Sequence, residues 1–137
     1  MREPPALLRV PPQLCPHRGR DAVSESETFV HASADLSGVG SGALRDASLL
    51  TGLLIAAAGA AGLNSTGSPI VRTGAGGEVS AVLLLDPCHL SIHSFPGRGL
   101  ALVDILARDE AAVAKALDVF MRRLVPATVI NETRKRG

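Results

Sequence analysis

The stretch that decides the fold is EVSAVLLLDPCHLSIHSFPGRGLALVDILA, residues 78–107. The apolar run 78–85, the strictly alternating run 89–95 and the run 100–107 each have the length and residue types of a strand. The breaks between them contain Pro and Gly, and they are too short for a helical crossover. This stretch therefore predicts three consecutive strands of a mainly antiparallel sheet.

Two amphipathic segments flank this region. From Ser41, the predicted N-cap, to a stop at Gly62, apolar residues recur at steps of three or four, which predicts one helix. A second helix begins at Asp109 and Glu110 and ends before Pro126. Its apolar stripe is Val113, Leu117, Phe120 and Leu124.

Further strands are predicted over 29–36, 70–72 and 127–133. The Gly-rich segment 74–77 precedes a strand and lacks the Lys-Ser/Thr of a phosphate loop, so it is interpreted as a hairpin turn. The expected fold class is α+β, a two-layer sandwich with two helices on one face of a mainly antiparallel sheet.

The chain has 137 residues, a length that suits one domain. Five of its nine prolines lie within the first 16 residues, and a polar run follows them. Residues 1–28 are therefore expected to be a flexible tail. Residues 29–133 are expected to form the domain and residues 134–137 a basic tail.

Composition excludes several function classes. The net charge is +1, from 14 basic and 13 acidic residues, and aromatic residues make up 2% of the chain, so a nucleic-acid surface is not expected. The apolar run 49–63 is shorter than a membrane-spanning helix, and no secretory signal is recognised. Two cysteines, Cys15 and Cys88, indicate reduced thiols in a cytoplasmic protein and no disulfide framework.

Reactive side chains concentrate in CHLSIHSFP, residues 88–96. Cys88 and His93 are candidates for a nucleophile and its base, because an imidazole can stabilise a thiolate. The structural alternative is a strand with a buried thiol and two hydrogen-bonded imidazoles. A metal site formed by Cys88, His89, His93 and His31 is a third interpretation, although no pair has the spacing typical of zinc ligands. We expect no metal.

The segment CHLSIHSFPGRGLALVDI, residues 88–105, resembles the signature of bacterial S-adenosylmethionine decarboxylases. That signature reads Glu-Ser-His-Leu-Thr-Ile-His-Thr-Trp-Pro-Glu, followed by an Asp within a strand. HASADLSG, residues 31–38, is similar to the first strand of the family, and the resemblance extends from about residue 30 to residue 133. Members are proenzymes that cleave themselves at the Glu-Ser bond and leave a pyruvoyl group. This carbonyl forms a Schiff base with S-adenosylmethionine and withdraws electrons as CO2 leaves, in spermidine and polyamine biosynthesis. The resemblance therefore implies a small-molecule substrate, a self-generated pyruvoyl cofactor and a symmetric homodimer with sites near the interface.

The resemblance also assigns roles to individual residues. His93 matches the histidine that shuttles protons during processing, and Ser80 matches the serine that assists cleavage. Phe95 matches an aromatic residue beside the substrate, and it is the candidate within the motif for stacking on an adenine ring. Cys88 occupies the position of the cleavage serine.

Three more departures bear on activity. Pro87 replaces the glutamate before the cleavage site, Gly97 replaces an acidic residue, and Arg108 replaces the cysteine that reprotonates the product. A thiol is a competent nucleophile for cleavage between Pro87 and Cys88, whereas Arg108 is not a proton donor near neutral pH. Two functions therefore stay open: a divergent pyruvoyl-dependent decarboxylase, or a non-catalytic relative that binds an adenosyl ligand or regulates an active paralogue.

Overall fold

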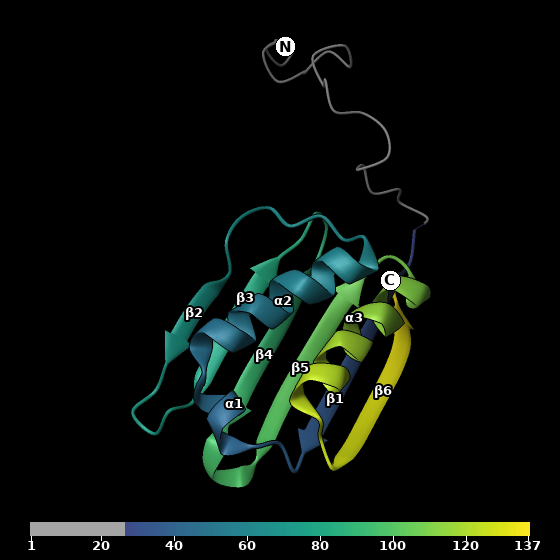
Figure 1. The fold of residues 1–137 in the computed structure, drawn as a ribbon. Coiled ribbons are helices and arrows are strands. Elements are labelled where there is room, and N and C mark those ends of the chain that lie inside the picture. Colours follow the sequence, from purple (N-terminus) through teal and green to yellow (C-terminus); the bar gives the residue numbers. More distant parts are fainter. Residues whose placement is uncertain (1–26) are drawn as a thin grey trace, which may run out of the picture.

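The computed structural model describes residues 27–137, which form one six-stranded antiparallel sheet with helices on one face (Figure 1). Residues 1–26, most of the expected N-terminal tail, lie outside the described part. The elements in chain order are β1 (Phe29–Ser37), α1 (Ser41–Arg45), α2 (Ala47–Ala61), β2 (Ile70–Thr73), β3 (Val79–Leu84), β4 (His89–Phe95), the 3-10 turn η3 (Pro96–Arg98), β5 (Leu100–Ala107), α3 (Glu110–Leu124) and β6 (Thr128–Arg136). The strand order across the sheet is β2-β3-β4-β5-β1-β6. The predicted α+β two-layer sandwich is confirmed.

Strands β3, β4 and β5 lie side by side within the sheet and arise from residues 78–107, with β4 and β5 at its centre. His89 pairs with Leu84 of β3 and with Leu106 of β5, so the register of all three strands is fixed at this residue. Both connections are tight, which is why the strands run antiparallel as expected. β1 then pairs with β5 and places the start of the domain beside its centre.

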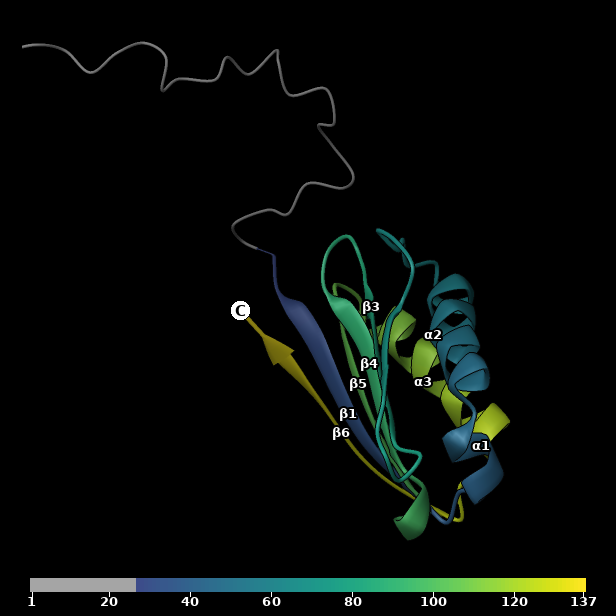
Figure 2. The same ribbon diagram turned by 90° about the vertical axis from the view of Figure 1, so that its left-hand side faces the viewer.

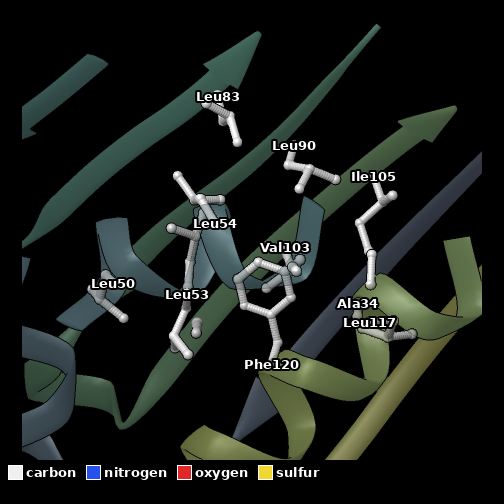
Figure 3. Close-up of a cluster of buried hydrophobic side chains, with 14 of the residues drawn as sticks. Ala34, Leu50, Leu53, Leu54, Leu83, Leu90, Val103, Ile105, Leu117 and Phe120 are labelled. Carbon is white, nitrogen blue, oxygen red and sulfur yellow. The ribbon is translucent and has the colours of Figure 1, made fainter. Parts of the chain in front are cut away.

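The core lies between the sheet and the helices (Figure 3). Alternation along the strands directs Leu83, Leu90 and Ile105 toward the helices, where each is buried. Phe120 of α3 is fully buried at the centre of this cluster, and Leu54 of α2 packs in the same layer. The predicted stripe of α3 is confirmed, since all four of its residues are buried.

The first predicted helix differs from expectation, because it is two helices. Asp46 separates α1 from α2 with an extended backbone (φ −88°, ψ 93°), and its side chain accepts a hydrogen bond from the backbone N–H of Leu49. Aspartate competes with helical hydrogen bonding and favours the N-cap position, which explains the break. Ser41 is the first helical residue and not the cap, which is Gly40. The predicted stop is confirmed: Gly62 ends α2 in the left-handed region, at φ 70°.

The last strand is longer than predicted. β6 continues to Arg136, so residues 134–136, expected in a basic tail, belong to the sheet. Pairing with β1 accounts for the difference, because Phe29 at the start of β1 lies opposite Arg136. Local composition gives no sign of this pairing.

The face of the sheet opposite the helices carries no covering element within residues 27–137 (Figure 2). Ser80, His93, Asp104 and His31 lie on it, at positions that alternate with core residues. In the described residues, no helix has the length and apolar character needed to cross a membrane.

Candidate functional site

Ser80 and His93 form a hydrogen-bonded pair on the uncovered face. They lie directly opposite each other on β3 and β4, and the distance from His93 Nδ1 to Ser80 Oγ is 2.8 Å. The alternation of each strand sets their orientation, since Ala81 and Ile92 beside them are buried in the core. The structure thus brings together two residues that the sequence singled out, in contact suited to proton transfer.

Cys88 ends the turn between β3 and β4 in a strained conformation. Its φ is 86°, a left-handed value that residues with a side chain rarely adopt. The turn is closed by a hydrogen bond of 2.9 Å from the backbone N–H of Leu85 to the carbonyl oxygen of Cys88. The thiol faces a mainly apolar pocket, whose other lining residues are Phe29, Pro87, Leu106, Arg136 and Gly137.

The surroundings of the Cys88 thiol favour its protonated form. Burial raises the pKa of Cys88, and the negative charge of Glu27 raises it further. The guanidinium of Arg108 acts in the opposite direction and lowers the pKa. Arg108 is itself held by Glu27, with 3.6 Å between Nε and a carboxylate oxygen.

One chain does not bring Cys88 close to the Ser80–His93 pair. His93 is five residues further along β4, which places its Cα roughly 16 Å from that of Cys88. Phe95 is seven residues along the same strand, or roughly 23 Å away. The roles of these residues at a common site therefore stay predictions.

Phe29 is an aromatic residue beside Cys88 that sequence reasoning missed. It begins β1 and lines the same pocket as the thiol. Its position follows from pairing of β1 with β5, where His31, two residues along, is opposite Leu106. No local sequence signal reports such a long-range register.

The histidines do not gather into a metal centre. His31 and His89 both pair with Leu106 from opposite sides, so a whole strand separates them. His31 instead contacts Asp104, with 2.9 Å between Nε2 and a carboxylate oxygen. Within residues 27–137, no group of three or more His, Cys, Asp or Glu side chains is placed to hold a metal ion.

Comparisons with known proteins agree on one family. The model of the S-adenosylmethionine decarboxylase family matches residues 30–137. The chain is 30% identical over 109 residues to the S-adenosylmethionine decarboxylase proenzyme of Aquifex aeolicus, a match that covers 79% of this chain and 80% of that protein. It is also 34% identical over 88 residues to the arginine decarboxylase proenzyme of Hyperthermus butylicus, covering 64% of this chain and 62% of that one. The crystal structure of the adenosylmethionine decarboxylase from Aquifex aeolicus superimposes with a TM-score of 0.76 at 29% identity, over 82% of this chain and 93% of that chain.

Proposed function

Because the chain belongs to the S-adenosylmethionine decarboxylase family, we propose that it is a divergent, self-processing, pyruvoyl-dependent decarboxylase. Its substrate would be S-adenosylmethionine or a related amino acid, and its product would serve spermidine and polyamine biosynthesis. The observation that carries the proposal is the hydrogen-bonded Ser80–His93 pair, at the two positions that match the processing residues of the family. A cytoplasmic location would keep the Cys88 thiol reduced for this chemistry.

Cys88 has what formation of a pyruvoyl group requires. The thiol would attack the carbonyl carbon of Pro87, so that an S–C bond forms, the peptide C–N bond breaks and the thiol proton moves to the freed amino group. Loss of the Cα proton of Cys88 then breaks its Cβ–Sγ bond. The sulfur stays on Pro87 as a thiocarboxylate, and residue 88 becomes dehydroalanine. Water replaces its nitrogen, which leaves as ammonia, and a pyruvoyl group remains at residue 88.

The strained backbone at Cys88 supports cleavage at this bond. A residue held at φ 86° stores on the order of 1–3 kcal/mol. Breaking the Pro87–Cys88 bond would release that strain. The pocket beside the thiol is lined mainly by apolar groups.

A second copy of the chain would complete the site. The estimated separation along β4 is too long for His93 to reach Cys88 of its own chain. The uncovered face carries apolar side chains that suit contact with another sheet: Ile70, Val82, Leu84, Leu102 and Leu106. Two sheets packed face to face about a two-fold axis would place His93 and Ser80 of one copy near Cys88 of the other. The homodimer is therefore part of the proposal.

The pocket at Cys88 would receive a small amino-acid substrate. When formed, a pyruvoyl group supplies a carbonyl that binds the substrate amine and withdraws electrons from the carbon that loses CO2. Phe29 offers a flat apolar surface at this pocket, and Phe95 would come from the other copy. Gly97 lies on η3 and contributes no carboxylate to orient the ligand.

The direct test of processing is the intact mass of the purified chain. We expect two fragments, residues 1–87 and 88–137, with the second carrying a borohydride-sensitive carbonyl. The first fragment should be heavier than a hydrolytic product by the difference between sulfur and oxygen, because it ends in a thiocarboxylate. Cys88→Ala should abolish cleavage. A single intact wild-type chain would refute self-processing.

Complementation tests the shared site. Cys88→Ala and His93→Ala chains should each stay uncleaved alone, whereas coexpression should restore cleavage of the His93→Ala chain in mixed dimers. The matched control is coexpression of Ser80→Ala with His93→Ala. In this mixture each chain lacks one member of the Ser80–His93 pair. Because the two residues pair within one chain, neither chain of the mixed dimer can supply an intact pair to Cys88 of the other. Equal restoration in both mixtures, or in neither, would contradict the arrangement.

A non-catalytic relative is the second candidate, and Arg108 is the observation that favours it. A guanidinium occupies the position where the family has its proton-donating cysteine. Such a protein would bind an adenosyl ligand or regulate an active paralogue. Calorimetry with S-adenosylmethionine on the Cys88→Ala chain separates the cases. Measurable binding with no CO2 release by the wild type supports this candidate, and absence of heat counts against it.

A further inference from the structure

Arg108 lies beside the bond that the proposed function requires to break. The β4–β5 ladder ends at the pair His89–Leu106, so Cys88 and Arg108 both lie within two residues of the same end of this ladder. Pro87 and Arg108 also line the same hollow, together with Asn64, Asp86 and Asp109. The end of the ladder and the shared lining therefore place Arg108 near Pro87, the residue on the carbonyl side of the Pro87–Cys88 bond.

The guanidinium is held at this place. The Arg108 side chain is 23% exposed and Glu27 is 29% exposed, so the pair is largely sheltered from water. A positive charge in such surroundings is costly unless a partner compensates for it, and Glu27 is one such partner. The ion pair fixes Arg108 near the end of β5, and the guanidinium opposes the effect of burial on the pKa of Cys88 whereas Glu27 adds to it.

We propose that Arg108 is a positioning residue for self-cleavage: its charge favours the thiolate of Cys88 and the negative charge that develops on the carbonyl oxygen of Pro87. This inference rests on the proposed function. Replacement of serine by cysteine at the cleavage position makes a nearby cation useful, because a thiol, unlike a hydroxyl, ionises readily under its influence. The same charge stabilises the tetrahedral oxyanion that forms when sulfur attacks the carbonyl. Arg108 would thus serve the cleavage step, although it cannot serve as a proton donor.

The other ionisable groups around Cys88 determine which control variants the experiment needs. Glu27 precedes β1, His89 follows the thiol on β4, and Arg136 of β6 lines the thiol pocket. Two carboxylates border the hollow: Asp86, and Asp109, which accepts hydrogen bonds from the first backbone N–H groups of α3. Of these groups, Arg108 lowers the pKa of Cys88 by its positive charge and Glu27 raises it by its negative charge.

The experiment follows the full chain from its uncleaved form, produced by in vitro translation with Cys15→Ser so that Cys88 is its single thiol. Iodoacetamide alkylation and cleavage are both recorded by mass between pH 6 and 10. Because burial keeps the thiol protonated, both rates should rise with pH.

Arg108→Gln should slow alkylation and cleavage by about tenfold at neutral pH and shift both pH profiles to higher pH. Glu27→Gln should shift them to lower pH, and Arg108→Lys should keep most of the wild-type rate. Arg136→Gln is the matched control for loss of a neighbouring guanidinium, with a smaller effect.

The outcomes separate this inference from the proposed function. If the wild type cleaves and Arg108→Gln cleaves equally fast with an unchanged alkylation profile, self-processing stands and the inference is wrong. If the wild type never cleaves, self-processing is wrong, and the alkylation profile still decides whether Arg108 activates the thiol. Equal effects of Arg108→Gln and Arg136→Gln would also overturn the inference, because any nearby positive charge would then suffice. Circular dichroism identifies a variant that fails to fold, and Arg108→Lys then carries the comparison.

Discussion

Ser94 carries a hydroxyl into the core, and its two hydrogen bonds connect three elements. It donates to the carbonyl oxygen of Leu44 at 2.7 Å and accepts from the backbone N–H of Val79 at 2.9 Å. Ser94→Ala would leave both groups buried without a partner. We expect a loss of about 1–3 kcal/mol in the free energy of unfolding, measured with urea. Ser91→Ala, on the uncovered face of the same strand, is the control and should change stability less. Equal losses would show that Ser94 does not connect these elements.

Single residues could be predicted where their position follows from the alternation of one strand. Residues whose contacts depend on pairing between distant strands could not. Ser80 and His93 stand out because each lies at an alternating position of a clear strand, and the structure joins them. Glu27 precedes the first strand and contacts Arg108, and Phe29 begins this strand and lines the pocket of Cys88. Nothing near these two residues in the sequence predicts either contact. Their placement depends on β1 pairing with β5, a contact between segments more than 60 residues apart.

The break between α1 and α2 at Asp46 can be tested through the contribution of this residue to the stability of the fold. Its carboxylate caps α2 by accepting from the backbone N–H of Leu49 at 3.0 Å. Asp46→Ala should destabilise the fold by about 1 kcal/mol, because the N–H group loses its partner. Asp118→Ala is a suitable control: it removes another carboxylate, one that forms an exposed i,i+4 ion pair with Arg122, and should have little effect. Thermal unfolding of both variants decides the matter. An equal shift in Tm would argue against the cap.

Strands were more predictable than helix boundaries for a physical reason. Alternation with period two persists through β4 and β5, because one face of each strand is in the core and the other is not. The apolar spacing of residues 43–61 is continuous across Asp46, so periodicity alone predicts one helix. Competition between side-chain capping and helix continuation decided the break. The end of β6 was missed for a different reason, since its residues are all exposed and carry no apolar pattern.

For the whole molecule, the uncovered sheet face is the feature that links fold to function. A two-layer sandwich buries one face of its sheet, and here the other face carries both the candidate processing pair and half-buried leucines. Leu102 lies between His93 of β4 and Asp35 of β1, at the centre of this face. If a second copy covers the face, both the site and the apolar side chains are accounted for by one contact.

Leu102→Lys tests that contact. A lysine at this position leaves the core untouched, because Ala101 and Val103 on either side face the helices. It would place a charge in the proposed interface, where desolvation without a partner is costly. We expect the wild type to sediment as a dimer and Leu102→Lys as a folded monomer that no longer cleaves itself. Ile55→Lys is the matched control, since Ile55 is 55% exposed on the opposite side, on α2, and this variant should remain a cleaving dimer. A monomeric Leu102→Lys chain that still cleaves would show that one copy contains the complete site.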